Sequence, residues 1–440
     1  MRRLVDIKPV LRPNTLEVKN EVIGAFHRYV RQQRADDKWQ AGLYEGDPTH
    51  SGSPSFYEIM KPLVYTGTTS YHDNEEVLDA IDDLIEARSE GQKGVIIVGD
   101  QQTFDRMVKL KAFHGRRYKH LMPFNGEMHV EAHFCHAGWK LWYGKLITGL
   151  LELYAPEQGA LKDDFTPKYW SYYDDFMMKI CSAGVAYLCK HVSIQHLDYN
   201  TLFSDCSENY TMTIFLHFLL DFAVPYVEMR QVLRMQSSAE TRKRMQAYYN
   251  LLLHMSRTEQ CNKFLYSVLA VHGTWIYHNS IPSLRRIWDR MSTVSLRGIP
   301  SRNIPIDHLI EKVNNFAKRM VRGKPTQQRI LTLIPALNIL MPAEAAYLHL
   351  IGGLDDEDKR YYSGKQSRAP DISRLVECLE SIIGGSWQEM QVPRDDNGFR
   401  QGFPGREPSD PWRLISDKQA DIDEYVDRIV DEMQWGEQHR

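Results

Sequence analysis

Acidic residues stand at two places in this sequence where a carboxylate could do chemistry. The first is Asp100, which follows the apolar run 95–98 and Gly99. Open α/β sheets place their ligands beyond the carboxyl ends of such strands. We therefore expect a rigidly held, partly desolvated carboxylate at the core of the domain, as suits a metal ligand or an acid/base group. An ordinary helix cap for the segment that follows is the structural alternative.

The second place is a predicted helix from 305 to 321, bounded by Pro305 and Gly323. Four polar residues on it are spaced by four, three and four positions and share one face: Asp307, Glu311, Asn314 and Lys318. Two carboxylates and an amide can bind a divalent cation through oxygen. A solvated surface face is the alternative explanation.

A third group follows the predicted strand at 120–124: His129, His133, Cys135 and His136. The first two histidines lie one helical turn apart, a spacing compatible with zinc and with a metal-dependent hydrolase. The sequence lacks the His-Glu-x-x-His motif of metalloproteases. The other explanation is a histidine hydrogen-bonded at the start of a helix, near the active end of the sheet.

Basic side chains gather in two segments and could contact phosphates there. In the later segment the candidate nucleic-acid-binding residues are Arg302, Lys312, Lys318, Arg319 and Arg322. The earlier group includes Lys109, Lys111, Arg116, Arg117 and Lys119. The sequence shows no phosphate-cradling P-loop, nucleophile elbow or dinucleotide fingerprint.

The elements that must position these residues follow from the hydrophobic pattern. Helical spacing predicts a helix at 16–33 and another that begins near Asp73, and an apolar run predicts a strand at 59–65. The β-branched run 95–98 predicts a strand buried on both faces. We expect a helix at 101–113, a short strand at 120–124, and from about Val130 helices without further strands. The later helices are expected near 371–384 and 416–434.

Composition limits the class of protein. Of the 440 residues, 25% are charged and 42% are hydrophobic, which is typical of a globular chain. The net charge of −3 does not indicate a nucleic-acid-binding protein. No apolar run reaches the length of a membrane span, so we expect no transmembrane helix and no membrane partner. The six cysteines lack a Cys-x-x-Cys pair, which favours reduced thiols inside the cell.

Three segments in this order, 95–104, 119–129 and 303–314, resemble the domain-of-unknown-function family 6589 of eukaryotic, transposon-like genes. That family has a Gly-Asp after a strand, a Pro-Gly-Asp-Trp-His-like turn and a Pro-x-Asp-x-x-x-Glu-x-x-Asn helix. Here the Asp and Trp of the turn are replaced, and the segment reads Asn125-Gly126-Glu127-Met128-His129. The resemblance extends from about residue 60 to 340.

The same order resembles the catalytic core of cut-and-paste transposases. This resemblance implies an RNase H-like α/β core with a large all-helical insertion, in a mainly helical chain. It makes Asp100 the second and Glu311 the third acid of a two-metal Mg²⁺ site that cleaves or transfers DNA strands. His129, Asp307 and Asn314 would support them, and Asp6 is the one candidate for the first acid.

Because no apolar strand carries the first acid convincingly, we expect an incomplete catalytic site, and whether the chain is an enzyme stays open. The alternative is a non-catalytic relic that binds DNA or protein. Of the two intracellular locations, we expect the nucleus rather than the cytoplasm. The predicted divisions are an N-terminal segment 1–55, the first part of the core 56–128, the insertion 129–300, late helices 301–345 and a tail 346–440.

Overall fold

A computed structural model of the chain provides the fold. It describes residues 26, 70–88, 95–114, 117–118, 121–142, 146–154, 170–191, 210–233, 293–294, 304–321, 326–350 and 372–384. The predicted helices at 16–33 (apart from Phe26) and 416–434, the predicted strand at 59–65, and Asp6 lie outside these residues.

The described part is mainly helical, as expected. Its α/β elements come first in the chain: α3 (Tyr71–Arg88), β1 (Val95–Gly99), α4 (Gln101–His114) and β2 (Leu121–Asn125). The helical series follows: α5 (Glu127–Trp142), α6 (Thr148–Tyr154), α7 (Trp170–His191), α9 (Tyr210–Phe218), the π-helical η5 (Leu219–Ala223) and α10 (Val224–Leu233). The later elements are β3 (Thr293–Val294), β4 (Ile304–Pro305), α14 (Ile306–Met320), α15 (Gln327–Leu350) and α17 (Ile372–Ile383).

Strands β1 and β2 pair in parallel, from Val95 opposite Leu121 to Gly99 opposite Asn125. Parallel strands require a crossover connection, and α4 provides it. Buried side chains of α3, α4 and β2 form the core of this unit, against which Val95 and Ile97 of β1 pack. The two strands therefore end side by side, and the N-H of Gly126 donates to the carbonyl of Gly99 at 2.7 Å.

The prediction of a β1 strand buried on both faces was wrong in its burial. Every residue of β1 is only partly buried, because β2 is its only partner among the described strands. The prediction of no strands after Val130 was also wrong, since β3 and β4 form a short antiparallel pair. Pro305 closes β4 and is the N-cap residue of α14, rather than a residue of its first turn.

Side chains of η5 pack directly against glycines of two neighbouring helices. A Cβ on Gly138 of α5 would overlap the ring of Phe222, and a Cβ on Gly184 of α7 would come within 2.9 Å of Leu219. Both partners belong to η5, where the π-helical turn widens the helix between α9 and α10. Single π-turns of this kind are uncommon, and the two glycines leave room for the side chains that this one presents.

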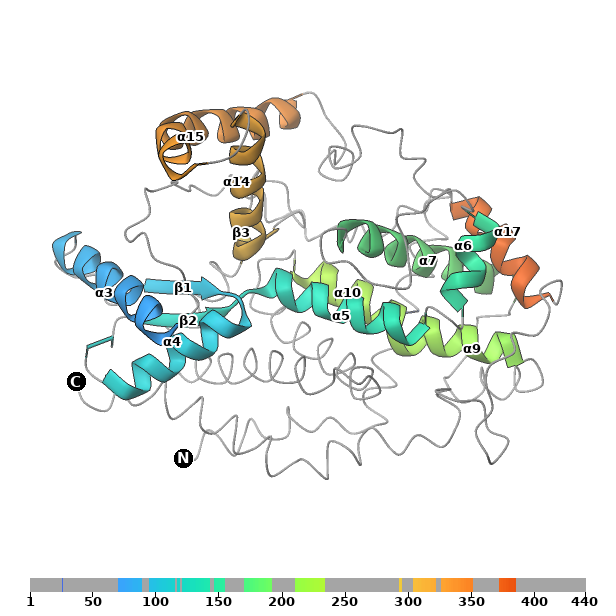
Figure 1. Ribbon diagram of the computed structural model, residues 1–440. Helices are drawn as coiled ribbons and strands as arrows, with labels where there is room; N and C mark the ends of the chain where they lie inside the picture. Colours follow the sequence, from blue (N-terminus) through green and yellow to red (C-terminus); the bar gives the residue numbers. More distant parts are fainter. Residues whose placement is uncertain are drawn as a thin grey trace, which may run out of the picture.

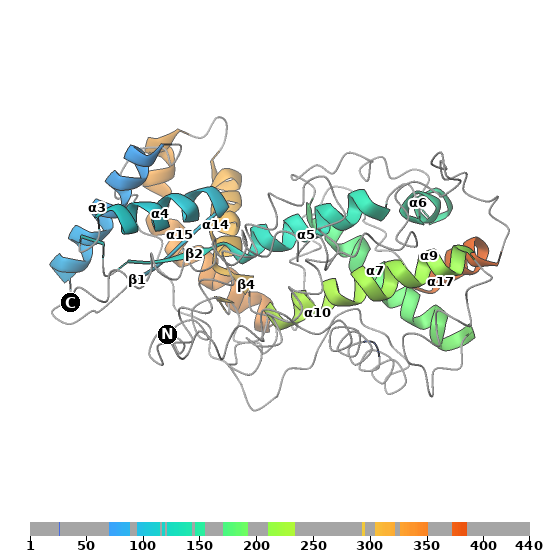
Figure 2. The same ribbon diagram turned by 90° about the horizontal axis from the view of Figure 1, so that it is seen from below.

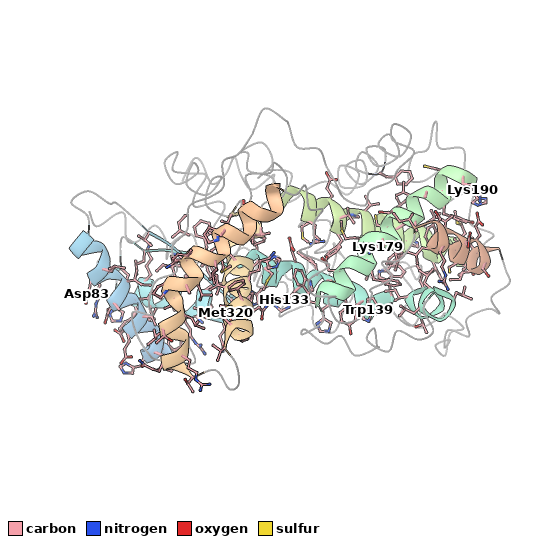
Figure 3. The ribbon with its side chains drawn as sticks, turned by 90° about the horizontal axis from the view of Figure 1, so that it is seen from above. Asp83, His133, Trp139, Lys179, Lys190 and Met320 are labelled. Atoms are coloured by element: carbon pink, nitrogen blue, oxygen red, sulfur yellow. The ribbon has the colours of Figure 1, made fainter. Side chains whose placement is uncertain are left out.

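The arrangement is elongated (Figure 1). The β1–β2 unit with α3 and α4 lies at one end, next to α14 and α15, and α6, α7, α9 and α17 lie at the other. Helix α5 starts at the end of β2 and continues into the helical array, as the view from below also shows (Figure 2). The side chains of His133 and Trp139 mark its course between the two ends (Figure 3).

The apolar helix from Thr211 to Arg230 is long enough to cross a membrane by length and composition. In the structure 78% of its most apolar window is buried, and its parts contact α5, α7 and α17. Burial inside the protein accounts for its composition.

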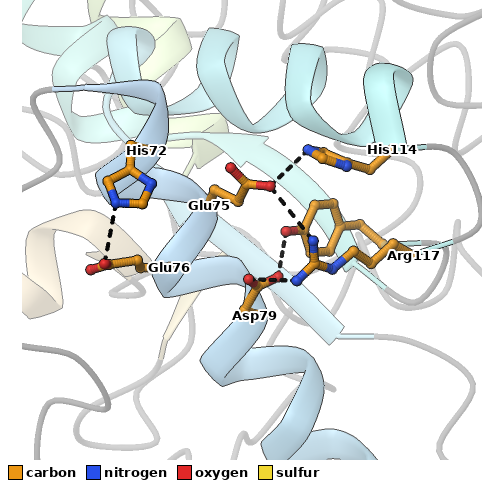
Figure 4. Close-up of polar contacts among 7 residues, drawn as sticks. His72, Glu75, Glu76, Asp79, His114 and Arg117 are labelled. Atoms are coloured by element: carbon orange, nitrogen blue, oxygen red, sulfur yellow. Dashed lines mark hydrogen bonds and ion pairs between the residues drawn. The ribbon is translucent and has the colours of Figure 1, made fainter.

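Two described members of the earlier group of basic residues, Lys111 and Arg117, make contacts within the fold. Lys111 is buried and donates from Nζ to the carbonyl of Leu121 at 2.7 Å. Arg117 lies between Glu75 and Asp79 of α3, with Nη2 at 2.6 Å from Asp79, in a network that His114 joins (Figure 4). Arg116 and Lys119 lie outside the described residues.

Candidate functional site

Asp100 closes β1 and opens α4. Its Oδ1 accepts the N-H of Thr103 at 2.8 Å, and its carbonyl accepts the N-H of Phe104 at 2.8 Å, so the predicted helix-cap role is confirmed. The expectation of a partly desolvated carboxylate at the core was wrong, because Asp100 is exposed. Gly99 is needed beside it: a Cβ there would stand 2.8 Å from the side chain of Thr103.

Asp307 joins the start of α14 to the start of α5. Its Oδ1 accepts the N-H of Met128 and its Oδ2 accepts the N-H of His129, both at 3.2 Å, across 179 and 178 residues of chain. Oδ2 also lies 2.9 Å from Nδ1 of His129. Asp307 is only 5% exposed, so at this residue the alternative of a solvated surface face is wrong.

Three carboxylates act on the ring of His129. The hydrogen bond to Asp307 raises the pKa of His129 above its ordinary value of 6.5, burial opposes this, and the charges of Asp307, Asp100 and Glu311 add to the rise. The carboxylates of Asp100 and Glu311 therefore both lie within electrostatic range of the ring. Asp100 lies between β1 and α4, whereas Glu311 lies on α14, 211 residues later in the sequence.

Helix α14 brings Glu311 to this place. Glu311 is partly buried one turn after Asp307, and α14 contacts β1, β3, β4 and α5. Apolar residues on its other side, Leu309 and Val313, pack with Val294 and Ile304. The predicted polar face is thus graded, from the buried Asp307 to the exposed Asn314 and Lys318.

The remaining candidate basic residues are spread more widely. Lys318 is exposed and Lys312 is partly buried on α14, and Arg319 lies on the same helix. Arg302 and Arg322 lie outside the described residues.

The predicted zinc ligands do not converge. Among the described residues, no group of three or more His, Cys, Asp or Glu side chains could hold a metal ion. His129 is engaged by Asp307. The thiol of Cys135 is fully buried, and that burial raises its pKa well above the usual range.

Two neighbouring residues carry more weight than the sequence suggested. Gly126 lies against Asp307, where a Cβ would overlap Oδ2. Glu127 is a buried acid at the first position of α5. In the sequence, both residues belong to the turn 125–129 of the family pattern, and nothing else in the sequence distinguishes them.

A separate polar cluster lies inside the helical array, where α5, α7 and α10 meet. Nη1 of Arg230 pairs with Asp174 at 2.7 Å, and Nε lies 3.7 Å from Glu131. The hydroxyl of Tyr226 donates to Asp174 at 2.7 Å. Both carboxylates are buried, so this cluster joins three helices through charge.

Comparisons with family models, with curated proteins and with solved structures give no significant match to this chain. The function is therefore inferred from the geometry of the site and from the sequence.

Proposed function

We propose that the chain is a transposase-derived, RNase H-like protein whose site at the ends of β1 and β2 acts on the phosphodiester backbone of DNA with Mg²⁺. The observation that carries the proposal is the convergence of Asp100, His129, Asp307 and Glu311 from three separate segments of chain. Carboxylates gathered beyond the carboxyl ends of parallel strands are the setting in which such chemistry is expected.

Asp100 and Glu311 are the residues that would hold the metal. Their carboxylate oxygens are of the kind that Mg²⁺ prefers. Among the described residues, Oδ2 of Asp100 and the carboxylate of Glu311 make no hydrogen bond or ion pair. The described donors are a partial set, since they contain no three-ligand group, and Asp6 lies outside them. When bound, the metal would polarise the phosphate and activate water.

His129 would act on the substrate directly. Asp307 holds its Nδ1, which leaves Nε2 with no hydrogen bond among the described residues. A histidine oriented by a carboxylate can pass a proton to or from a reacting oxygen at its other nitrogen. In this proposal Nε2 of His129 protonates the leaving oxygen of the cleaved strand.

A second candidate is a non-catalytic DNA-binding relic. It is favoured by the partial ligand set and by the use of both Asp100 and Asp307 as helix caps. Lys318, exposed on α14, would then contact the phosphate backbone.

A nicking assay on supercoiled plasmid with Mg²⁺ or Mn²⁺ tests the first candidate. Asp100→Asn and Glu311→Gln are the informative variants. Because an asparagine caps α4 as well as an aspartate does, a loss of nicking in Asp100→Asn is not a loss of folding. We expect nicking by the wild type, none with EDTA, and a decrease of at least about 100-fold in both variants, more than the loss of a supporting residue causes.

Duplex binding in the same preparations separates the two candidates. Folded wild type that binds without nicking, with binding intact in both variants, supports the relic. Lys318→Gln should then reduce the salt dependence of log K by about one. The matched control is Lys109→Gln, since Lys109 is paired with Asp105. Folded protein that neither nicks nor binds contradicts both candidates.

A further inference from the structure

The start of α5 lacks a cap from its own segment of chain. Helix α5 begins at Glu127 and the residue before it is Gly126, which has no side chain. The second and third amides of a helix normally bond to the side chain at the cap position. Here the N-H groups of Met128 and His129 both bond to Asp307 instead.

Everything that faces the Asp307 carboxylate in these contacts is a donor. The donors are two backbone N-H groups and Nδ1 of His129, at the positive end of the α5 dipole. An asparagine of the same shape would turn an NH₂ group toward one or more of them. The site therefore requires the carboxylate itself, and Gly126 provides the room for it.

The same carboxylate sets the place of α14. Asp307 is in the first turn of α14, and Glu311 follows it by one turn. The contact with α5 fixes this first turn, while the C-terminal part of α14 is more exposed. The position of Glu311 relative to Asp100 and His129 thus depends on the docking of this turn.

We propose that Asp307 is the positioning residue of the site: it docks α14 on the first turn of α5, so that Glu311 and His129 are brought to the same end of the sheet as Asp100. The roles of those three residues rest on the proposed function, whereas the docking itself is a property of the folded chain. A capping role alone would not require α14 to be held.

Hydrogen exchange of the full chain, without metal or DNA, tests the docking. In Asp307→Asn we expect exchange to become about tenfold faster in peptides covering 126–131 and 306–313, the size of effect that loss of one helix cap gives. Peptides from α7 and α9 should be unchanged. The matched control is Asp105→Asn, which removes a carboxylate from the surface pair with Lys109.

A second variant separates positioning from capping. In an Asp307→Ala background, Gly126→Ser restores a cap from the chain itself, in the space that the carboxylate leaves. We expect protection to return at 126–131 and to remain lost at 306–313. Recovery in both segments would show that Asp307 is only a cap, and would overturn the proposal.

Unchanged exchange in Asp307→Asn would overturn it too, as would an equal increase in α7 and α9. Because exchange is measured on the folded chain alone, a negative nicking assay has no bearing on this result. Docking without nicking would count against the proposed function and leave the positioning role standing.

Discussion

At the residue scale, the contact between His129 and Asp307 links the stability of the fold to pH. The hydrogen bond from Nδ1, at 2.9 Å, raises the pKa of His129. A raised pKa in the folded state means that folding favours the protonated ring. The stabilisation is therefore complete below the unfolded-state pKa, about 6.5, and is lost as pH rises through the folded-state value.

We predict that wild type loses its stability advantage over His129→Gln as the pH rises. The free energy of unfolding in urea, measured from about pH 5.5 to 9, should differ most below about pH 6.5, where the unfolded-state ring is also protonated. His72→Gln is the control, since the side chain of His72 is 79% exposed and pairs with Glu76 at 3.5 Å on the surface. A difference between wild type and His129→Gln that does not vary with pH would contradict the link.

At the element scale, the crossing of α5 over η5 depends on a glycine. The ring of Phe222 occupies the place of a Cβ at Gly138, and it stacks on Tyr226 with ring centroids 5.6 Å apart. Around this contact Trp142 and Phe218 are also buried. Cores of this density have little room for an added methyl group.

We predict that Gly138→Ala lowers the free energy of unfolding by about 3 kcal/mol, the upper part of the range for overpacking. Phe222→Ala alone should cost about 3–5 kcal/mol through the cavity it leaves. In the double variant the new methyl group enters that cavity, so the combined loss should be smaller than the sum of the two. Simple additivity in urea unfolding would show that the two residues do not share this space.

At the scale of the whole molecule, one buried cluster ties together the three helices that form the middle of the array. Arg230 of α10 faces Asp174 of α7 and Glu131 of α5. Glu131 follows His129 by two residues near the start of α5, so the cluster anchors the first part of the helix on which His129 lies. Removing one partner of a buried ion pair leaves a charge in a medium that solvates it poorly.

We predict that Arg230→Gln destabilises the chain by about 3–5 kcal/mol, the usual cost of breaking a buried pair. Arg230→Lys, which keeps the charge and loses the planar fork, should cost less. Urea unfolding followed by far-ultraviolet circular dichroism measures both. An effect of Arg230→Gln no larger than that of an exposed pair, about 1 kcal/mol or less, would mean that the cluster contributes little.

Local sequence patterns are sufficient to predict several of the helices and strands. The continuous β-branched run before Gly99 predicts a strand, the helical spacing after it predicts a helix, and a short strand is predicted at 120–124. The structure has all three elements. Phe104 and Met107, which share the apolar face of α4, are buried. The helices at 306–320 and 372–383 were predicted for the same reason.

The contacts that charged residues on these elements make depend on tertiary packing. Asp307 looked like one more residue of a polar helix face, yet it caps a helix 178 residues away. Lys111 looked like a candidate phosphate contact and is a buried donor to β2. Periodicity reports which side of an element is apolar; it carries no information on which distant segment will dock there. The partners of these charged groups were therefore set by the docking of α14 and α4, beyond the reach of any local pattern.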